Sequence, residues 1–218
     1  MTKDTSKTAL VTGASRGLGA ACAEFLAANG YHVIALARTT GALEELDDRI
    51  QATGGAATLV PVDLTNDNAM QQICRSIYER WGKLDMLVHA AIHAPPLCPV
   101  GHMDEKDLDK SIANNIRATS RLIVNTEPLL KTARGHAVFF NDAVKSKRYH
   151  ATYGLTKAAQ MRLARSWQDE VKATGITVHV LEPAPMPTAL RARFYPGEDR
   201  DALVSCKEEA ERLFSGLI

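Results

Sequence analysis

Short apolar runs alternate along this chain with longer segments in which apolar or small residues recur at helical spacing. The runs have the length of strands, and the segments between them have the length of helices. Strands that are apolar throughout need cover on both faces, so the alternation predicts a parallel sheet between two layers of helices. The predicted strands are Ala9–Thr12, His32–Ala37, Thr58–Val62, Met86–Ala90, Ala137–Phe140 and Thr177–Leu181, and the predicted helices lie near residues 17–29, 41–52, 67–81, 104–131, 153–173 and 200–215.

Right-handed crossovers between such strands give an α/β, doubly wound, Rossmann-like fold of about six strands. The 218 residues are 45% hydrophobic, which suffices for a buried core, so residues 1–218 are expected to form one domain. Ligands of such sheets bind beyond the carboxyl ends of the strands. We therefore look for the chemistry of the chain at that edge.

Composition narrows the class of partner. The net charge of +1 gives no reason to expect a nucleic acid or an anionic membrane. The N-terminus lacks the apolar core of a signal peptide, and no apolar run approaches the roughly 20 residues of a membrane span. The 4 cysteines form no CxxC pair, which suits a reducing cytoplasm better than a disulfide framework or a zinc site. We expect a cytoplasmic protein that acts on a small molecule.

A glycine-rich turn connects the first predicted strand to the first predicted helix and reads Thr12-Gly13-Ala14-Ser15-Arg16-Gly17-Leu18-Gly19. Its three glycines let the backbone approach a bulky group without Cβ clashes. The helix behind them presents free N–H groups and the positive end of its dipole, which together favour a pyrophosphate. The turn therefore predicts a dinucleotide site that includes Gly13, Ser15, Arg16, Gly17, Leu18 and Gly19.

The end of the second predicted strand bears on which dinucleotide binds. Folds that use NAD commonly place an acid there for the ribose 2′-hydroxyl, whereas this chain has Arg38 followed by two threonines. The Arg38 guanidinium, with Arg16 in reach, suits a 2′-phosphate and favours NADP(H) over NAD(H). The alternative is that both arginines are ordinary solvated surface side chains.

Asp63, at the end of the third predicted strand, has two interpretations. It can accept a hydrogen bond from the adenine amino group of the cofactor, or it can cap the helix that follows. Thr65 or Asn66 can supply that cap instead, which would leave Asp63 to the cofactor.

Tyr153 and Lys157 stand four residues apart at the start of the helix after the fifth predicted strand, so they share a face of it. A lysine ammonium beside a phenol stabilises the phenolate and lowers the pKa of the tyrosine. The phenol can then act as a general acid or base nearer neutral pH.

Further motifs are residues 80–85 (Arg-Trp-Gly-Lys-Leu-Asp), Asn115, and Pro183 with Thr188. With these, the chain resembles the classical short-chain dehydrogenase/reductase family along nearly all of its length. The resemblance implies a Rossmann-like sheet, a nicotinamide cofactor, and hydride transfer between that cofactor and a carbonyl or alcohol carbon.

The resemblance also implies roles for individual residues. Tyr153 would exchange a proton with the substrate oxygen, and Lys157 would bind the nicotinamide ribose and tune Tyr153. Asn115 would hold a proton-relay water, and Thr188 would contact the nicotinamide carboxamide. Further cofactor contacts are implied at Leu64, Ala90, Ala91 and Pro183.

One position departs from the family's pattern, because Asp142 stands where the family has a serine that holds the substrate oxygen. An ionised carboxylate only accepts hydrogen bonds, raises the pKa of Tyr153 and opposes negative charge on the substrate oxygen. Three interpretations stay open. Asp142 is protonated or orients a substrate that donates to it, Asn141 or Ser146 supplies the donor, or the site is catalytically weak.

Two other departures concern the cofactor and the assembly. The family's Asn-Asn-Ala-Gly reads His89-Ala90-Ala91-Ile92, which puts a branched side chain near the adenosine ribose. His89 and His93 lack carboxylate or thiol partners at ligand spacing, so we predict no metal site. The chain stops about where the helix before the family's seventh strand ends, which predicts six strands and favours a homodimer through 104–131 and 153–173.

The substrate pocket is expected between residues 93–103 and a lid formed by 184–199, where Arg191 and Arg193 are solvated or contact an acidic substrate or a cofactor phosphate. The leading prediction is an NADP(H)-dependent oxidoreductase for a small or medium carbonyl or alcohol. The alternative is a catalytically weak or inactive dinucleotide-binding protein that serves as a redox sensor or scaffold.

Overall fold

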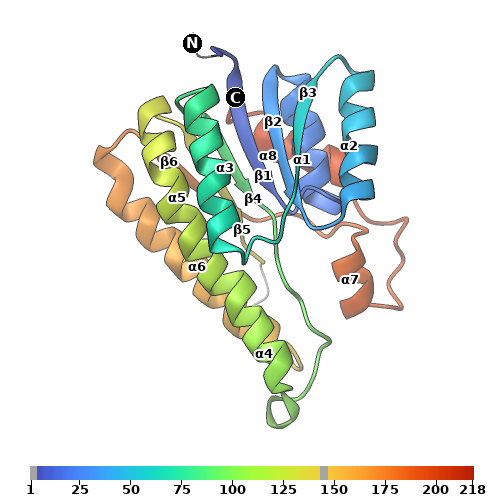
Figure 1. Ribbon diagram of the computed structural model, residues 1–218. Coiled ribbons are helices and arrows are strands. Elements are labelled where there is room, and N and C mark those ends of the chain that lie inside the picture. Colours follow the sequence, from blue (N-terminus) through green and yellow to red (C-terminus); the bar gives the residue numbers. More distant parts are fainter. Residues whose placement is uncertain (1–3, 143–146) are drawn as a thin grey trace.

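The computed structural model of the protein describes residues 4–142 and 147–218, and this part of the chain contains a six-stranded parallel sheet (Figure 1). The strand order is β3-β2-β1-β4-β5-β6, so the chain winds outward from β1 first to one side and then to the other. The predicted doubly wound sheet is confirmed, and each predicted strand overlaps an observed one. The strands are β1 (Lys7–Thr12), β2 (Tyr31–Ala37), β3 (Ala56–Pro61), β4 (Met86–His89), β5 (His136–Phe140) and β6 (Thr177–Leu181).

Helices cover both faces of the sheet (Figure 1). Successive side chains of a strand point to opposite faces, so Leu10 of β1 packs in one core, and Ala9 and Val11 pack in the other. The side chains in both cores are buried, which is why the strands are largely apolar. One face carries α1 (Gly17–Ala28), α2 (Thr40–Ala52) and α8 (Cys206–Phe214), and the other carries α3 (Asp67–Arg80), α5 (Ala118–Ala133) and α6 (Ala151–Glu170).

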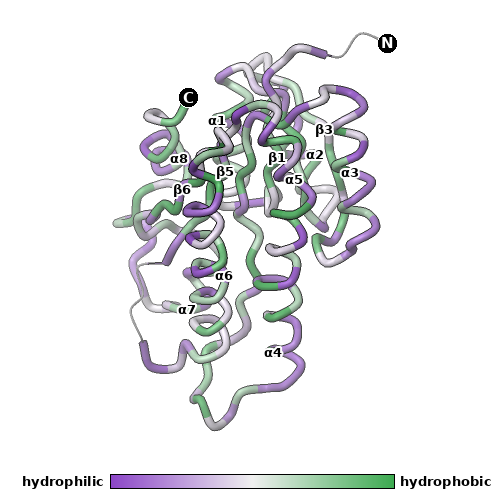
Figure 2. Tube along the Cα trace, turned by 90° about the vertical axis from the view of Figure 1, so that its left-hand side faces the viewer, coloured by the Kyte–Doolittle hydropathy of each residue, from purple (hydrophilic) through white to green (hydrophobic). Residues whose placement is uncertain are grey.

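Hydropathy along the chain follows this layering (Figure 2). The strands are largely hydrophobic, whereas α4 (Glu105–Ser111), which extends beyond the sheet, is mostly hydrophilic. Within the described residues, the helices are all too short or too polar to cross a membrane.

The segment predicted as one helix over 104–131 is three elements. α4 passes at Ile112 into a π-helical turn, η2 (Ile112–Arg117), and α5 continues from Ala118. The cause is tertiary, because the buried Asn115 amide pairs with the backbone of His93. Its Oδ1 accepts from the His93 N–H at 2.7 Å, and its Nδ2 donates to the His93 carbonyl oxygen at 2.8 Å. Such π turns are rare and occur often at functional sites.

Other boundaries differ from the prediction by a few residues. β4 ends at His89 rather than at Ala90, and the last predicted helix, 200–215, is the shorter α8. The helix predicted near 153–173 is α6 followed by a 3-10 turn, η3. The turn η3 spans Val171–Ala173. Two short elements were not predicted from the pattern, η1 (Val100–His102) and α7 (Ala189–Phe194).

A buried carboxylate fastens α8 to the loop after β6. Glu209 is 1% exposed and accepts a hydrogen bond from the backbone N–H of Ala184 at 2.7 Å. Arg212 pairs with the same carboxylate at 2.6 Å, and its hydrogen bonds hold the pKa of Glu209 below its usual value. The loop that borders the carboxyl edge of the sheet is thereby held against α8.

Replacing Glu209 by alanine leaves the Ala184 N–H without its acceptor. We expect Glu209→Ala to lower the free energy of unfolding by about 1–3 kcal/mol. The control Glu211→Ala, at an exposed position of the same helix, should change it by about 0.5 kcal/mol or less. Urea unfolding followed by circular dichroism measures both. Because the pKa of Glu209 is lowered by folding, its stabilisation is present near neutrality and is lost as the pH falls through the folded-state pKa. Equal losses in the two variants would contradict the role of Glu209.

Candidate active site

A cavity of about 1180 Å³ lies at the carboxyl edge of the sheet. It is bordered by the glycine turn, the segments after β2, β4 and β5, the loop after β6, and α7. Figure 1 shows α4 and α7 beyond the same edge of the sheet. Of the predicted site residues, Asn115 does not line this cavity, and the remainder do: Gly13, Ser15, Arg16, Gly17, Leu18, Gly19, Arg38, Asp63, Leu64, Ala90, Ala91, Asp142, Tyr153, Lys157, Pro183 and Thr188.

The glycine turn approaches neighbouring backbone so closely that side chains are excluded. Gly13 has φ +70°, and a Cβ there would lie 2.7 Å from the backbone nitrogen of Ala91. A Cβ on Gly19 would collide with the carbonyl oxygen of Gly13. Arg16 occupies the N-cap of α1 with no side-chain capping bond in the described part of the chain, so the first N–H groups of α1 remain available to an anion.

Asp63 pairs with residues at the same edge rather than capping a helix. Its Oδ1 accepts from the backbone N–H of Thr65 at 2.9 Å and from the Thr65 hydroxyl at 2.7 Å. Arg38 lies 3.9 Å from its other oxygen. Burial acts to raise the pKa of Asp63, but the Thr65 hydrogen bonds and the Arg38 charge outweigh burial and lower it. Asn66 caps α3 by accepting from Ala69 N at 3.1 Å, so the capping interpretation of Asp63 is wrong.

Tyr153 donates its phenol hydrogen to Asp142 at 3.0 Å. The tyrosine is 6% exposed, and its pKa is raised well above the usual value by burial first, and then by the charge of Asp142 and this hydrogen bond. The carboxylate therefore favours the neutral phenol. Of the alternative donors, Asn141 donates to Glu182 at 2.7 Å, and Ser146 lies outside the described residues.

Lys157 lines the cavity one helical turn after Tyr153. Burial lowers the pKa of Lys157 to about 8, and the negative charge of Asp142 acts in the opposite direction. Its Nζ donates to Oε1 of Gln160 at 2.8 Å. At neutral pH the side chain is therefore mostly charged, with little margin before it loses its proton.

Asn115 stands behind the cavity and connects it to α6. Besides its bonds to His93, its Nδ2 donates to the hydroxyl oxygen of Thr156 at 3.0 Å. Thr156 lies between Tyr153 and Lys157 on α6, and it is fully buried. The π turn is thus held against the helix that carries both side chains.

α7 lies over Tyr153. The Phe194 ring packs edge-on against the Tyr153 ring, with centroids 5.0 Å apart. Arg193 donates to the carbonyl oxygen of Ala94, which links α7 to the segment after β4. The two segments expected to line the substrate pocket are therefore in contact.

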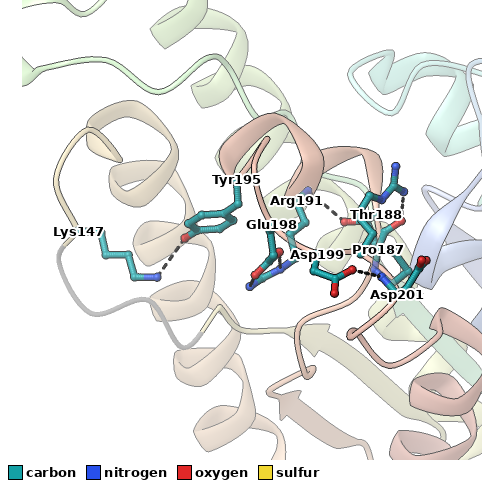
Figure 3. A network of polar contacts seen from close by, with 9 residues as sticks. Lys147, Pro187, Thr188, Arg191, Tyr195, Glu198, Asp199 and Asp201 are labelled. Carbon is teal, nitrogen blue, oxygen red and sulfur yellow. Dashed lines mark hydrogen bonds and ion pairs between the residues drawn. The ribbon is translucent and has the colours of Figure 1, made fainter.

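The remainder of the lid is stabilised by its own side chains (Figure 3). Arg191 makes two hydrogen bonds to Glu198, and Lys147 donates to the Tyr195 hydroxyl at 3.0 Å. Thr188 caps α7 by accepting from the Arg191 N–H at 3.2 Å. Arg191 is thus ion-paired with Glu198 rather than simply solvated, whereas contact of Arg191 or Arg193, which both line the cavity, with a substrate or cofactor phosphate stays a prediction.

Some residues at the site were not predicted from the sequence. Phe194 is one, since nothing in a six-residue helix reports what it covers. Gln160 and His89 are others, and of the two only His89 left a signal, because it is the polar residue of the otherwise apolar β4.

Residues 7–199 of the chain match the family model described as short chain dehydrogenase. The chain belongs to this family. The resemblance carried by the motifs is thus confirmed, and the protein is an oxidoreductase of the short-chain type.

Relatives and solved structures agree with this assignment. The chain is 31% identical over 177 residues to a fatty acyl-CoA reductase of Acinetobacter baylyi. The match covers 79% of this chain but only 60% of that protein, which is less than two thirds of its length. It is 29% identical over 211 residues to the 3-oxoacyl-acyl-carrier-protein reductase FabG of Escherichia coli, covering 95% of this chain and 84% of that one. A metagenomic short-chain oxidoreductase solved in complex with NADP has a TM-score of 0.80 at 26% identity, with 95% of this chain and 88% of that chain covered.

The close approach of the glycine turn leads to a prediction about stability. Gly19→Ala introduces a Cβ that collides with the Gly13 carbonyl, so we expect the free energy of unfolding to fall by about 1–3 kcal/mol. Gly41→Ala, in the first turn of α2 with nothing within 4 Å of the new Cβ, is the matched control and should be neutral or stabilising by up to about 1 kcal/mol. Denaturant unfolding of both variants measures this. If the free energy of unfolding of Gly19→Ala equals that of the wild type, the turn can widen without cost and the prediction is wrong.

Proposed function

We propose that the protein reduces a small or medium carbonyl compound with NADPH, and that Tyr153 is the general acid. The observation that carries this proposal is that Tyr153 and Lys157 line the same cavity as the glycine turn. Hydride addition to a carbonyl carbon leaves an oxygen that must gain a proton, and a neighbouring phenol can supply it. The raised pKa of Tyr153 keeps that phenol in its acid form.

The turn fits the diphosphate of a dinucleotide. Gly13 and Gly19 let the turn pack closely against its own backbone, and the free N–H groups and dipole of α1 favour an anion at this place. When bound, the nicotinamide cofactor supplies the hydride. Following the family resemblance, we assign Thr188 to the carboxamide, and further contacts to Leu64, Ala90, Ala91 and Pro183.

Lys157 and Asn115 support the proton transfer in this proposal. Once Tyr153 has given its proton to the substrate oxygen, a charged Lys157 stabilises the phenolate that remains. Lys157 also holds the nicotinamide ribose, and Asn115 holds a water through which Tyr153 regains its proton. The hydrogen bonds of Asn115 to the backbone of His93 fix the position from which it would do so.

Asp142 favours a second candidate function. In the reductase it holds the phenol hydrogen-bonded before the reaction, but an ionised carboxylate beside Tyr153 also opposes the negative charge that grows on the substrate oxygen. That opposition is the specific observation in favour of a dinucleotide-binding protein with little turnover, a redox sensor or scaffold.

We further propose a preference for NADP(H) over NAD(H). Arg38 follows β2 with its side chain 68% exposed, so it is free to turn toward a 2′-phosphate. Arg16 lines the same end of the cavity. Asp63 lies 3.9 Å from Arg38 and would have to share it with the phosphate.

Exposed apolar side chains and buried thiols bear on the assembly and the compartment. Ile112, Val124 and Leu155 are exposed apolar side chains on η2, α5 and α6, which supports a homodimer through these helices. Cys22 and Cys74 are buried free thiols, which supports a reducing, cytoplasmic location.

Turnover tests the two candidate functions. We expect NADPH oxidation with a panel of aldehydes and ketones, and we expect Tyr153→Phe to lower kcat by about 10²–10⁴-fold because the substrate oxygen loses its acid. NADPH affinity, measured by calorimetry, should stay within about threefold in that variant. If the wild type binds NADPH but turns over nothing, while Asp142→Ser gains turnover, the binding-protein function is correct instead.

Cofactor preference tests the assignment of Arg38. Arg38→Ser removes a charged donor from the 2′-phosphate, so NADPH affinity should fall by about 10- to 100-fold while NADH affinity changes little. Arg75→Ser, an exposed arginine on α3, is the control. Titration calorimetry with both nucleotides measures the effect, and equal losses for NADPH and NADH would show that Arg38 does not contact a 2′-phosphate.

A further inference from the structure

A chain of buried polar side chains runs through the core behind Lys157. Thr12 of β1, His89 of β4, Thr119 of α5 and Gln160 of α6 are each at most 3% exposed. Oxygen and nitrogen atoms in such a place are costly unless each has a partner. The ring of His89 packs edge-on against the apolar Phe139, and the four residues find most of their side-chain hydrogen bonds with one another.

The hydrogen-bond pattern assigns a direction to the first half of this chain. Thr119 donates its hydroxyl hydrogen to the carbonyl oxygen of Asn115 at 2.8 Å, so toward His89 Nε2, 2.8 Å away, its oxygen is left as an acceptor. In this arrangement His89 carries its proton on Nε2, and its Nδ1 accepts from Thr12 Oγ1 at 2.7 Å. Thr12 Oγ1 also accepts from the Ala91 N–H at 3.4 Å.

Gln160 completes the chain and faces Lys157. Because Thr119 donates its hydroxyl hydrogen to a carbonyl oxygen, its own oxygen can accept a hydrogen bond from Gln160 Nε2 at 3.0 Å. His89 Nε2, 3.2 Å from the same nitrogen, is itself a donor and is the poorer partner. With Nε2 committed to Thr119, the amide oxygen of Gln160 turns to Lys157, whose Nζ donates to it at 2.8 Å.

We propose that His89, Thr119 and Gln160 are positioning residues that hold one fixed acceptor, the Gln160 amide oxygen, against the Lys157 ammonium. The acceptor stabilises the charged lysine in a buried place and sets where its Nζ points. This inference rests on the proposed function, in which a charged Lys157 is needed beside Tyr153. His89 suits a fixed frame, because burial and the charge of Lys157 lower its pKa to about 3 and leave it neutral at physiological pH.

The surroundings of Lys157 explain why one acceptor matters. The titratable groups that act on it or feel its charge are His89 from β4 and Asp142 from the segment after β5, while Tyr153 lies one turn earlier on the same helix and lines the same cavity. η2 brings the neutral amide of Asn115. Burial lowers the pKa of Lys157 to about 8, so a change of one unit decides whether it is charged at neutral pH.

Two substitutions of Gln160 test the proposal with opposite signs. If activity needs charged Lys157, it falls as the pH rises through the pKa of that lysine. Gln160→Leu removes the acceptor and should move this alkaline limb of kcat/KM down by about one pH unit. Gln160→Glu keeps an acceptor and adds a negative charge, and should move the limb up. If Gln160 only fills space, the alkaline limb would stay in place in both variants or move in the same direction in both. Either result would overturn the proposal.

A matched pair of threonines separates positioning from packing. Thr119 and Thr126 are both fully buried on α5, and each donates to the carbonyl oxygen four residues earlier at 2.8 Å. Thr119→Val removes the partner of Gln160 and should lower kcat/KM at neutral pH about tenfold. Thr126→Val makes the same chemical change at a residue that does not bond to His89 or Gln160. Its kcat/KM should stay within about twofold of the wild-type value. Equal effects of the two valines would overturn the role of Thr119.

The pH dependence of NADPH affinity is read by calorimetry in the same variants. If the wild type turns over no carbonyl, the proposed reductase fails, but Lys157 still titrates beside the cofactor site. The alkaline loss of NADPH affinity should then shift down in Gln160→Leu and up in Gln160→Glu. Coincident binding curves for wild type and both variants would refute the positioning role independently of turnover.

Discussion

Burial of the parallel sheet on both faces is the constraint on which the rest of this structure depends. Because helices cover both faces, the strands are largely apolar, and polar groups collect where the strands end. The carboxyl edge therefore holds the glycine turn, Arg38, Asp142 and the loop after β6 around one cavity. The same constraint acts on any polar side chain that remains inside. Thr12 and His89 lie on adjacent strands with almost no exposure, and they are tolerated because they bond to each other.

What the sequence could predict follows from the same constraint. Continuous apolar runs indicate burial on two faces, so the strands and the doubly wound parallel sheet were predictable. The glycine spacing reports a close backbone approach, and Asp142 was correctly expected to raise the pKa of Tyr153. The π turn was not predictable, because its cause is a pairing of Asn115 with the backbone of His93, 22 residues away. A polar residue at position 160 becomes meaningful only once His89 is known to lie near it.

Tyr153 and Lys157 are driven in opposite directions by one environment. Burial disfavours charge, so it raises the pKa of the phenol and lowers that of the ammonium. Asp142 adds to the first shift and opposes the second. The result is a phenol that keeps its proton and a lysine whose pKa, about 8, lies close to neutral pH. Pairs of groups whose pKa values are set by contrasting effects are typical of acid–base sites. In the proposed reductase, the charge of Asp142 would favour the neutral phenol before proton transfer over the phenolate after it.

The lid bears on this balance, because burial is the largest cause of the raised pKa of Tyr153. Phe194 of α7 packs against the phenol ring as part of that burial, and Arg193 donates to the carbonyl oxygen of Ala94. A substrate that reaches Tyr153 must pass or displace Phe194. If water enters with it, the phenol becomes more acidic, and if the substrate is apolar and takes the place of the ring, the phenol stays neutral. The packing of α7 against Tyr153 thus couples what occupies the pocket to the acidity of the phenol beneath it.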